Sequence, residues 1–332
     1  MDVPTLDFSP FAGRRAPNAT PTPEQLAFAQ QLGAVNRAHG FAVLANTGVS
    51  GEAFFDAAKT LFGLSPEEKA RLAVPDRATG SNTGYFPLAS EKLNSSRSGD
   101  AKEAYNVRAA LNDFTATPTG FEAAALSFWD ASLGLAEGVL TACALSLSLP
   151  PDFFASRQAK REQCTLRVLH YPPSEEPPSA DAGSEATVGA DADAKCSIRC
   201  GEHTDFGTVT LLFVDHSGGP DGAAGLEVKQ TLDDGSTRWV PVTPPPGCVV
   251  VNTGGLLARW TNDAWRATAH RVVSTRSSAR AHRYSIALFN DPDADVLVDC
   301  LPQFVSEETP ARYAPITSGE YLLAKLAEAQ RS

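Results

Sequence analysis

Several features that mark other classes of protein are missing or rare in this chain of 332 residues. Acidic residues outnumber lysine and arginine, which gives a net charge of −11 and an isoelectric point near 5.0. Nucleic acids and anionic membranes favour clustered basic residues, so the sequence indicates neither as a partner. No uninterrupted apolar run approaches the ~20 residues of a transmembrane helix. The opening residues, MDVPTLDFSPF, lack the basic and long apolar segments of a secretory signal.

Cysteine is also sparse, and its spacing does not favour a structural metal site. The six cysteines form no CxxC pair, and Cys196 and Cys200 have no second pair to complete a four-cysteine site, so free thiols are expected. The full set is Cys143, Cys164, Cys196, Cys200, Cys248 and Cys300. We therefore predict a soluble, cytoplasmic protein with no obligate protein partner. Its 42% hydrophobic content is enough to bury a large core.

The N-terminal region, residues 1–120, has the pattern of a mixed α/β segment. Short strands are predicted over VPTLDF and FAVLAN. Helices are predicted after two capping boxes, each with proline at the first helical position: Thr22 with Gln25, and Ser65 with Glu68. Residues 120–147 carry large apolar side chains at helical spacing, which predicts a long helix packed on a large surface.

From about residue 164 the pattern changes to short strands separated by Gly, Pro and Asp turns. They are CTLRVLHY, GTVTLLFV, GLEV, WVPV, GCVVVN, TAHRVV and RYSIALF. Short connections favour an antiparallel barrel or sandwich over βαβ units. We predict one compact unit over 1–332, mainly β, with helices packed around the β core. The acidic, proline-containing stretch 174–197 has no periodicity and is predicted to be a surface insertion.

The segment GEHTDFGTVTLLF brings a histidine and an aspartate close together. In extended structure His203 and Asp205 point to the same side. An isolated HxD is more often a hydrogen-bonded surface pair than a ligand pair. His270, in the strand-like ATAHRVV, offers a third arm, because a buried histidine needs a partner for its ring nitrogens. Two histidines and one carboxylate are the usual donors of non-haem Fe(II) sites for oxygen chemistry.

A second pair lies near the end of the β region. Arg283 and Ser285 are two apart on one predicted strand and point the same way. A guanidinium that faces a β core is costly unless it meets an anion, and a carboxylate fits it well. Tyr171, at the end of RVLHYPP, could reach the same anion. The alternative is a structural ion pair with Asp291 or Glu202.

In this order, His203-x-Asp205, His270 and Arg283-x-Ser285 resemble the iron- and 2-oxoglutarate-dependent dioxygenases of the isopenicillin-N-synthase-like superfamily. The resemblance covers nearly the whole chain, in family order. Its blocks are VPTLDFS, HGFAVLANTGV, SPEEKARL, LHYPP, HTDFGTVTLLF, GLEV, VVVNTGGLLARWTND, HRVV and RYSIALF.

The resemblance implies a double-stranded β-helix, or jelly roll, cupin-like, with its core at 160–295 and helices packed on one sheet. It implies that His203, Asp205 and His270 hold Fe(II), and that Arg283, Ser285 and Tyr171 bind the distal carboxylate of 2-oxoglutarate. The reaction would use O2 to convert 2-oxoglutarate into succinate and CO2 while hydroxylating, desaturating or dealkylating a small molecule, with ascorbate as a candidate reductant.

Three positions depart from the family pattern. Leu169 stands where relatives commonly have Asn, Gly255 stands where they have an acid, and Glu202 precedes the first ligand where small residues are frequent. None of the three belongs to the triad. By likeness to relatives, the substrate would contact residues from the N-terminal region and the facing sheet. The candidates are Tyr85, Phe86, Lys92, Tyr105, Arg108 and Phe213, with the C-terminal helix near Tyr321.

Two other functions stay open at this point. Ring-forming oxidases of the same superfamily retain the Arg-x-Ser pair without using 2-oxoglutarate, so the chain could be an iron-dependent oxidase of that kind. An inactive binding or sensor protein on the same fold is the third hypothesis. Succinate release coupled to substrate consumption separates the first two, and Fe(II) binding tests the third.

Overall fold

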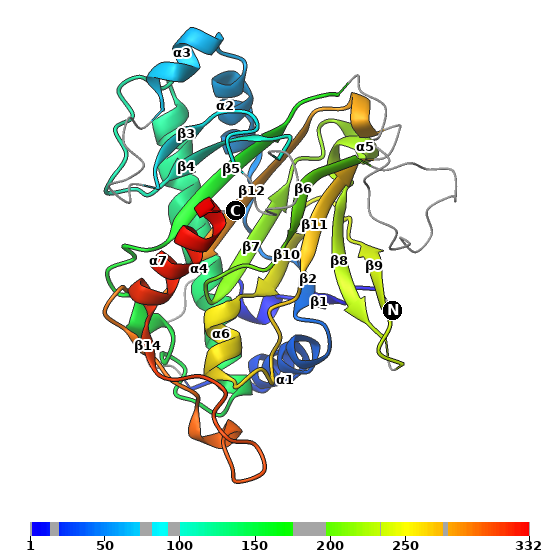
Figure 1. The fold of residues 1–332 in the computed structure, drawn as a ribbon, viewed down its shortest axis with the longest axis vertical. Coiled ribbons are helices and arrows are strands. Elements are labelled where there is room, and N and C mark those ends of the chain that lie inside the picture. The colour runs from blue at the N-terminus through cyan, green and yellow to red at the C-terminus, as the bar shows by residue number, and fades with distance from the viewer. Residues whose placement is uncertain are drawn as a thin grey trace.

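The computed structural model describes residues 2–13, 20–73, 82–91, 100–174, 197–232, 234–274 and 278–331. Within these residues two sheets face each other, and helices cover the outer side of the larger sheet (Figure 1). The larger sheet has the strand order β1-β2-β10-β7-β12-β5-β4-β3, and the smaller has the order β6-β11-β8-β9. This is the double-stranded β-helix, or jelly roll, that the family resemblance implies.

The strands of the larger sheet are β1 (Thr5–Asp7), β2 (Phe41–Ala45), β10 (Val249–Thr253), β7 (Val209–Val214), β12 (Arg283–Asn290), β5 (Thr165–Tyr171), β4 (Glu103–Val107) and β3 (Gly84–Phe86). Those of the smaller sheet are β6 (Ser197–His203), β11 (His270–Ser274), β8 (Leu226–Thr231) and β9 (Thr237–Pro241). Leu297–Val298 (β13) pairs with Ile316–Thr317 (β14). All seven strands predicted from residue 164 onward are present.

The helices are α1 (Pro23–Ala38), α2 (Glu52–Phe62), α3 (Pro66–Arg71), α4 (Phe121–Ser146), α5 (Gly219–Ala223), α6 (Gly255–Trp260) and α7 (Ser318–Arg331). Both predicted capping boxes are confirmed. The Thr22 hydroxyl accepts from the Gln25 backbone N–H at 3.3 Å, and the Gln25 side chain accepts from the Thr22 N–H at 3.1 Å. Ser65 and Glu68 cap α3 in the same reciprocal way.

Helix α4 is the central helix of the outer layer. It contacts α1 and α2 on one side and β7 and β12 on the other, and Phe128 packs edge-on against Phe213 at 4.9 Å between ring centroids. Among the described helices, α4 alone is long and apolar enough by composition to cross a membrane. However, 61% of its most apolar 18-residue window is buried against these neighbours, as expected for a core helix.

Strands of the N-terminal region extend the larger sheet at both ends. β2 pairs with β10 at one end, and β4 pairs with β5 at the other. The sequence did not predict β3, β4 or β6: β3 has three residues, and β4 and β6 lie close to segments without periodicity. The predicted insertion at 174–197 lies outside the described residues except at its two ends.

Candidate active site

Two strand ends and the turn between β6 and β7 bring His203, Asp205 and His270 together. His203 is the last residue of β6, His270 is the first residue of β11, and the two are register partners in the smaller sheet. Asp205 lies in the turn that leaves β6 and enters β7 of the larger sheet. The sequence placed His203 and Asp205 two apart on one extended segment. In the structure the strand ends at His203, and the turn directs the carboxylate back toward the imidazoles.

Each donor atom that could bind a metal is free on the side facing the other two. The Nε2 atoms of His203 and His270 lie 4.0 and 3.8 Å from Asp205 Oδ1, and all three lie within 4.8 Å of one another. The opposite ring nitrogens are already engaged. His203 Nδ1 donates to the Gly201 carbonyl at 2.8 Å, and His270 Nδ1 donates to the Thr268 carbonyl at 3.2 Å. These bonds fix the tautomers that leave both Nε2 atoms as acceptors.

The second carboxylate oxygen of Asp205 is held by Asn252. Asn252 Nδ2, on β10, donates to Asp205 Oδ2 at 2.6 Å, and Asn252 is 4% exposed. The Asp205 carbonyl also accepts from the Gly255 N–H at 2.9 Å. From the sequence, residues 252–255 stood out only for the acid that is absent at Gly255, and Asn252 was not predicted to contact a metal ligand. The signal for Asn252 was its place at the end of an apolar strand, where an amide must find a partner.

Electrostatics keep His203 and Asp205 in the protonation states that a metal requires. Burial and the neighbouring His270 imidazole lower the pKa of His203 to about 4, so the ring is neutral at pH 7. Burial opposes ionisation of Asp205, but His270, His203 and hydrogen bonds from Asn252 and Thr210 hold the pKa of its carboxyl below the usual value. A neutral imidazole and an ionised carboxylate are the metal-binding forms of these two side chains. Two nitrogens and one oxygen on one side fit Fe(II) with the remaining positions open.

A buried guanidinium lies on the same side of the larger sheet. Arg283, at the start of β12, is 2% exposed; its Nε donates to the Ala224 carbonyl at 2.9 Å and its Nη1 to Ser285 Oγ at 3.1 Å. Its Nη2 is buried and has no hydrogen-bond partner among the described residues. The guanidinium also lies over the ring of Tyr171, its register partner on β5, at 5.0 Å. Within the described part of the chain, neither Asp291 nor Glu202 forms the structural ion pair that the sequence left open.

Side-chain alternation defines the wall between this guanidinium and the triad. On β12, Arg283, Ser285, Ala287 and Phe289 share one face, and Ala287 pairs with Leu212 of β7. Leu212 and Phe289 pack with Tyr171 and the Cys200 side chain of β6 in a small apolar cluster between the two sheets. The face of the larger sheet that is turned toward the smaller sheet, called the cavity face below, is therefore mostly apolar, with polar groups at its two ends.

The substrate candidates fall on both faces of the larger sheet. Tyr85, Tyr105 and Phe213 belong to the apolar core on the helix side, where Tyr105 packs on Phe121 of α4 at 5.1 Å. Strand alternation therefore turns these three away from the triad, and as substrate contacts they were predicted wrongly. Phe86 lies on the cavity face with Tyr171.

The remaining residues singled out from the sequence lie in different parts of the structure. Arg108 is close enough to Asp291 for their charges to interact, and Asp291 packs on Gly207, two residues after Asp205. Lys92 lies outside the described residues. Tyr321 of α7 lies against Gly255, where a methyl group would meet the Tyr321 hydroxyl at 2.3 Å. Glu202 is on the surface side, with its carboxylate 3.3 Å from Lys229 Nζ.

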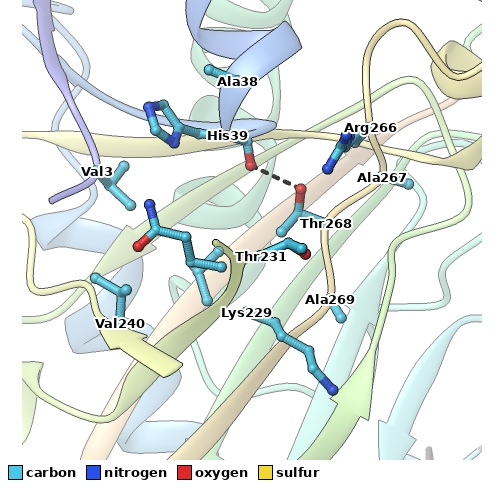
Figure 2. Close-up of a pocket in the computed structure, with 12 residues that line it drawn as sticks. Val3, Ala38, His39, Lys229, Thr231, Val240, Arg266, Ala267, Thr268 and Ala269 are labelled. Atoms are coloured by element: carbon cyan, nitrogen blue, oxygen red, sulfur yellow. Dashed lines mark hydrogen bonds between the residues drawn. The ribbon is translucent and has the colours of Figure 1, made fainter. Parts of the chain in front are cut away.

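A hollow of about 190 Å³ lies away from the triad (Figure 2). It is lined by the end of α1, the edge of β8 and β9, and the segment before β11, with the Thr268 hydroxyl donating to the His39 carbonyl at 2.8 Å. No triad residue lines it. It is therefore separate from the site.

The family models and curated relatives agree with the geometry. The model described as the 2OG-Fe(II) oxygenase superfamily matches residues 162–292, and the one described as the non-haem dioxygenase in morphine synthesis N-terminal matches residues 3–129. The 2-oxoglutarate-Fe(II) type oxidoreductase ppzD of Metarhizium rileyi is 31% identical over 349 residues, covering 98% of this chain and 90% of the relative. The chain belongs to the 2OG-Fe(II) oxygenase superfamily.

Solved structures of this superfamily superpose over nearly the whole length. A full-length Neurospora crassa protein, solved in complex with alpha-KG and thymine, matches with a TM-score of 0.78 and 28% identity, covering 98% of this chain and 96% of that chain. A 2OG-Fe(II) oxygenase family protein from Caulobacter crescentus matches with a TM-score of 0.74 and 30% identity, covering 98% of both chains. As a member of this superfamily, the protein is an Fe(II)- and 2-oxoglutarate-dependent dioxygenase, which uses O2 and acts on a small molecule.

Proposed function

We propose that His203, Asp205 and His270 hold the Fe(II), and that Arg283 binds the distal carboxylate of 2-oxoglutarate with help from Ser285 and Tyr171. One observation carries the second assignment: Arg283 is 2% exposed, yet its Nη2 has no partner among the described residues. A buried guanidinium nitrogen without an acceptor costs free energy, which a bound carboxylate recovers through paired charge-assisted hydrogen bonds.

The distance along β12 between the guanidinium end and the metal end supports a cosubstrate that reaches from Arg283 to the triad. Ser285 and Phe289 are four residues apart on β12, roughly 13 Å at the rise of a strand. Phe289 pairs with Thr210, whose side chain bonds Asp205, so this end of the strand lies beside the triad. A five-carbon dicarboxylate fits between Arg283 and the metal ligands, with the side chains of Ala287 and Leu212 beneath it.

The residues of this chain perform the binding and orienting steps. When bound, the iron supplies the redox chemistry that couples decarboxylation of 2-oxoglutarate to oxidation of the substrate. The backbone carbonyls of Gly201 and Thr268 hold the two imidazoles in the binding tautomer, and Asn252 aims Asp205. Leu212, Phe289 and Leu169 cover the cosubstrate with apolar surface, which excludes water from the reacting atoms.

We infer that the oxidised product is a hydroxylated small molecule, with desaturation and dealkylation as the other outcomes of the same chemistry. The relative from Neurospora crassa is described with thymine and with 5-formyluracil bound. Those ligands support a compact organic substrate for this chain as well.

Cosubstrate binding tests the assignment directly. Anaerobic titration of the Mn(II)-loaded protein with 2-oxoglutarate should give a Kd that rises about 10- to 150-fold in Arg283→Ala, the cost of a charged hydrogen bond. Tyr85→Phe, on the opposite face of the sheet, should leave it unchanged. An unchanged Kd in Arg283→Ala would refute the role of Arg283. Substrate consumed without succinate would instead identify an oxidase that does not use 2-oxoglutarate.

A further inference from the structure

The strand that carries His203 is irregular just before this residue. In the pairing of β6 with β11, His203 lies opposite His270. Three residues earlier on β6, Cys200 lies opposite Val272, which is only two residues later on β11. The extra residue on β6 forms a β-bulge. Residues three apart on a regular strand face opposite sides, yet here Cys200 packs between the two sheets and His203 still reaches Asp205. The bulge therefore turns His203 toward the triad.

A side chain from the N-terminal region holds the backbone of this bulge. Within the described strands, β6 is the edge of the smaller sheet, so only one of its sides has a strand neighbour. The Gly201 N–H donates to Asp100 Oδ1 at 2.9 Å. The Gly201 carbonyl accepts from His203 Nδ1 at 2.8 Å. Gly201 thus joins the Asp100 carboxylate to the ring of a proposed metal ligand.

The Asp100 carboxylate is itself fixed in place. Asp100 is 8% exposed, and its Oδ2 accepts from Lys102 Nζ at 2.5 Å. The Asp100 backbone N–H donates to the Glu91 carbonyl at 2.8 Å, and the Glu91 carboxylate pairs with Arg167 of β5. Asp100 is therefore tied to the larger sheet, while its Oδ1 holds a strand of the smaller sheet.

The Lys102 ammonium completes this bridge between the sheets. Lys102 is 3% exposed, and its Nζ lies 3.8 Å from Cys200 Sγ, one residue before Gly201. Burial opposes the charge of the amine, but Cys200, Asp100 and Glu91 raise its pKa above the usual value. Lys102 is therefore charged at pH 7 and supplies the counter-charge for Asp100.

An ion pair buried this deeply contributes little to stability by its charges alone. The cost of removing two charges from water offsets most of their mutual attraction. The pair of Asp100 and Lys102 has a directional effect as well, because it fixes one acceptor atom at the N–H of the bulge. Groups that orient a ligand imidazole through its second nitrogen typically change metal affinity about 10- to 100-fold.

We propose that Asp100 is a positioning residue for the iron site, and that Lys102 holds its carboxylate in place. Asp100 fixes the Gly201 backbone in the bulge, and the Gly201 carbonyl sets the tautomer and ring plane of His203. The N-terminal region thereby shapes the metal site, although the three proposed ligands come from other segments. This proposal rests on the proposed function, because it takes His203 as an iron ligand.

Two double variants with the same charge isolate the acceptor at position 100. Asp100→Ala/Lys102→Met removes both charges and the acceptor. Asp100→Asn/Lys102→Met removes both charges but keeps a side-chain oxygen for the Gly201 N–H. Mn(II) binding to the full chain is followed by electron paramagnetic resonance of the free ion, without 2-oxoglutarate, so that cosubstrate affinity does not contribute. We expect a Kd about tenfold higher in the alanine variant than in the asparagine variant.

The absorption of bound Co(II) provides a signature that a loss of stability alone would not change. At saturating Co(II), the visible ligand-field bands report the arrangement of the coordinating atoms. The asparagine double variant should keep the bands of the unaltered protein. The alanine double variant should show shifted bands, because the ring plane of His203 is no longer fixed. If the two double variants share the same Mn(II) Kd or the same Co(II) spectrum, the proposal is wrong.

A buried carboxylate on the opposite face of β4 provides the control. Glu103 follows Lys102 directly, but its carboxylate pairs with Lys69 of α3 on the helix side, at 3.0 Å. Glu103→Ala should lower the melting temperature of the metal-free protein and leave the Mn(II) Kd unchanged. An equal rise of the Kd in this variant would show a general loosening of β4 and would refute a specific role of Asp100.

A further single variant keeps the test intact if the alanine double variant does not fold. Asp100→Glu retains the charge and the partner Lys102, but the added methylene displaces the acceptor from the Gly201 N–H. It should also raise the Mn(II) Kd, and a Kd equal to that of the unaltered protein would overturn the proposal.

The two proposals fail in different ways. If the unaltered protein binds neither Mn(II) nor Co(II), the assignment of the triad is at fault. If it binds both ions and the variants of Asp100 bind them in the same way, the triad stands and Asp100 has only a structural role.

Discussion

Replacing Asn252 with alanine should weaken metal binding although none of the three metal ligands is changed. Asn252 Nδ2 donates to Asp205 Oδ2 at 2.6 Å, and this bond leaves Oδ1 directed at the two imidazoles. A hydrogen bond to a charged group contributes about 1.5–3 kcal/mol. Loss of a residue that orients a metal ligand typically costs about 10- to 100-fold in metal affinity, about 1.4–2.8 kcal/mol. The two estimates of the free-energy cost therefore agree.

A second hydrogen bond reduces the expected effect. Thr210 also bonds the Asp205 carboxylate, so the ligand is not fully released when the amide is removed. We therefore expect the lower part of the range, about a 10- to 30-fold rise in the metal Kd. Mn(II) binding in the presence of 2-oxoglutarate, followed by electron paramagnetic resonance of the free ion, measures this change directly.

A buried asparagine far from the site provides the control. Asn36 of α1 is also 4% exposed, and its amide contacts Cys143 Sγ at 3.9 Å. Asn36→Ala should cost stability through the same loss of a buried amide but leave the Mn(II) Kd unchanged. If Asn252→Ala binds Mn(II) like the unaltered protein, or if both variants weaken binding equally, Asn252 does not orient the ligand.

Three further predictions follow from the same geometry. Asp205→Ala should abolish Fe(II)-dependent succinate release while circular dichroism stays native; full activity would mean that the triad is misassigned. Arg283→Ala should raise the KM for 2-oxoglutarate at least about tenfold with Fe(II) affinity retained, and a change confined to Fe(II) affinity would contradict the carboxylate role. Gly254→Ala should lower stability by about 1–3 kcal/mol and weaken metal binding, because its methyl group would meet the Gly207 carbonyl at 2.4 Å. Gly134→Ala on the exposed side of α4 has no atom within 4 Å and should raise the melting temperature slightly; a loss of stability in both glycine variants would remove the steric argument.

The strands and helices with strong local signals could be predicted from the sequence. Capping boxes such as Thr22 with Gln25 are local hydrogen-bond patterns, so they appear in the sequence as they do in the structure. The strands that were missed depend on tertiary pairing. β6 carries His203, yet it begins directly after the long acidic stretch, and its pairing with β11 cannot be read from neighbouring residues.

Some features of the candidate site could likewise be predicted from the sequence, and others could not. Histidine, aspartate and arginine at the ligand positions are costly inside a β core, so their presence alone indicates a function. Which face a strand turns to the cavity depends on register with its neighbours. Tyr85 and Phe86 differ by one residue, but only Phe86 faces the cavity, because β3 pairs with β4 in the register that places Phe86 opposite Ala104.

Asn252 was missed as a site residue, and the position of Asp291 beside Gly207 was not predicted, for a related reason. Both lie close to Asp205 in space but are 47 and 86 residues away along the chain. The β10–β7 pairing brings Asn252 near Thr210 and Asp205, and close packing on Gly207 brings Asp291 there. Contacts between residues so far apart along the chain can be identified only once the fold is known.

Anaerobic titration of the purified protein with Fe(II) in the presence of 2-oxoglutarate tests the central claim most directly. The account predicts one Fe(II) per chain and a weak charge-transfer band that needs both the metal and 2-oxoglutarate. The band should be lost in Asp205→Ala and should require more 2-oxoglutarate in Arg283→Ala. A protein that binds Fe(II) without such a band, or whose band survives in Asp205→Ala, would contradict the assignment of the triad and its cosubstrate.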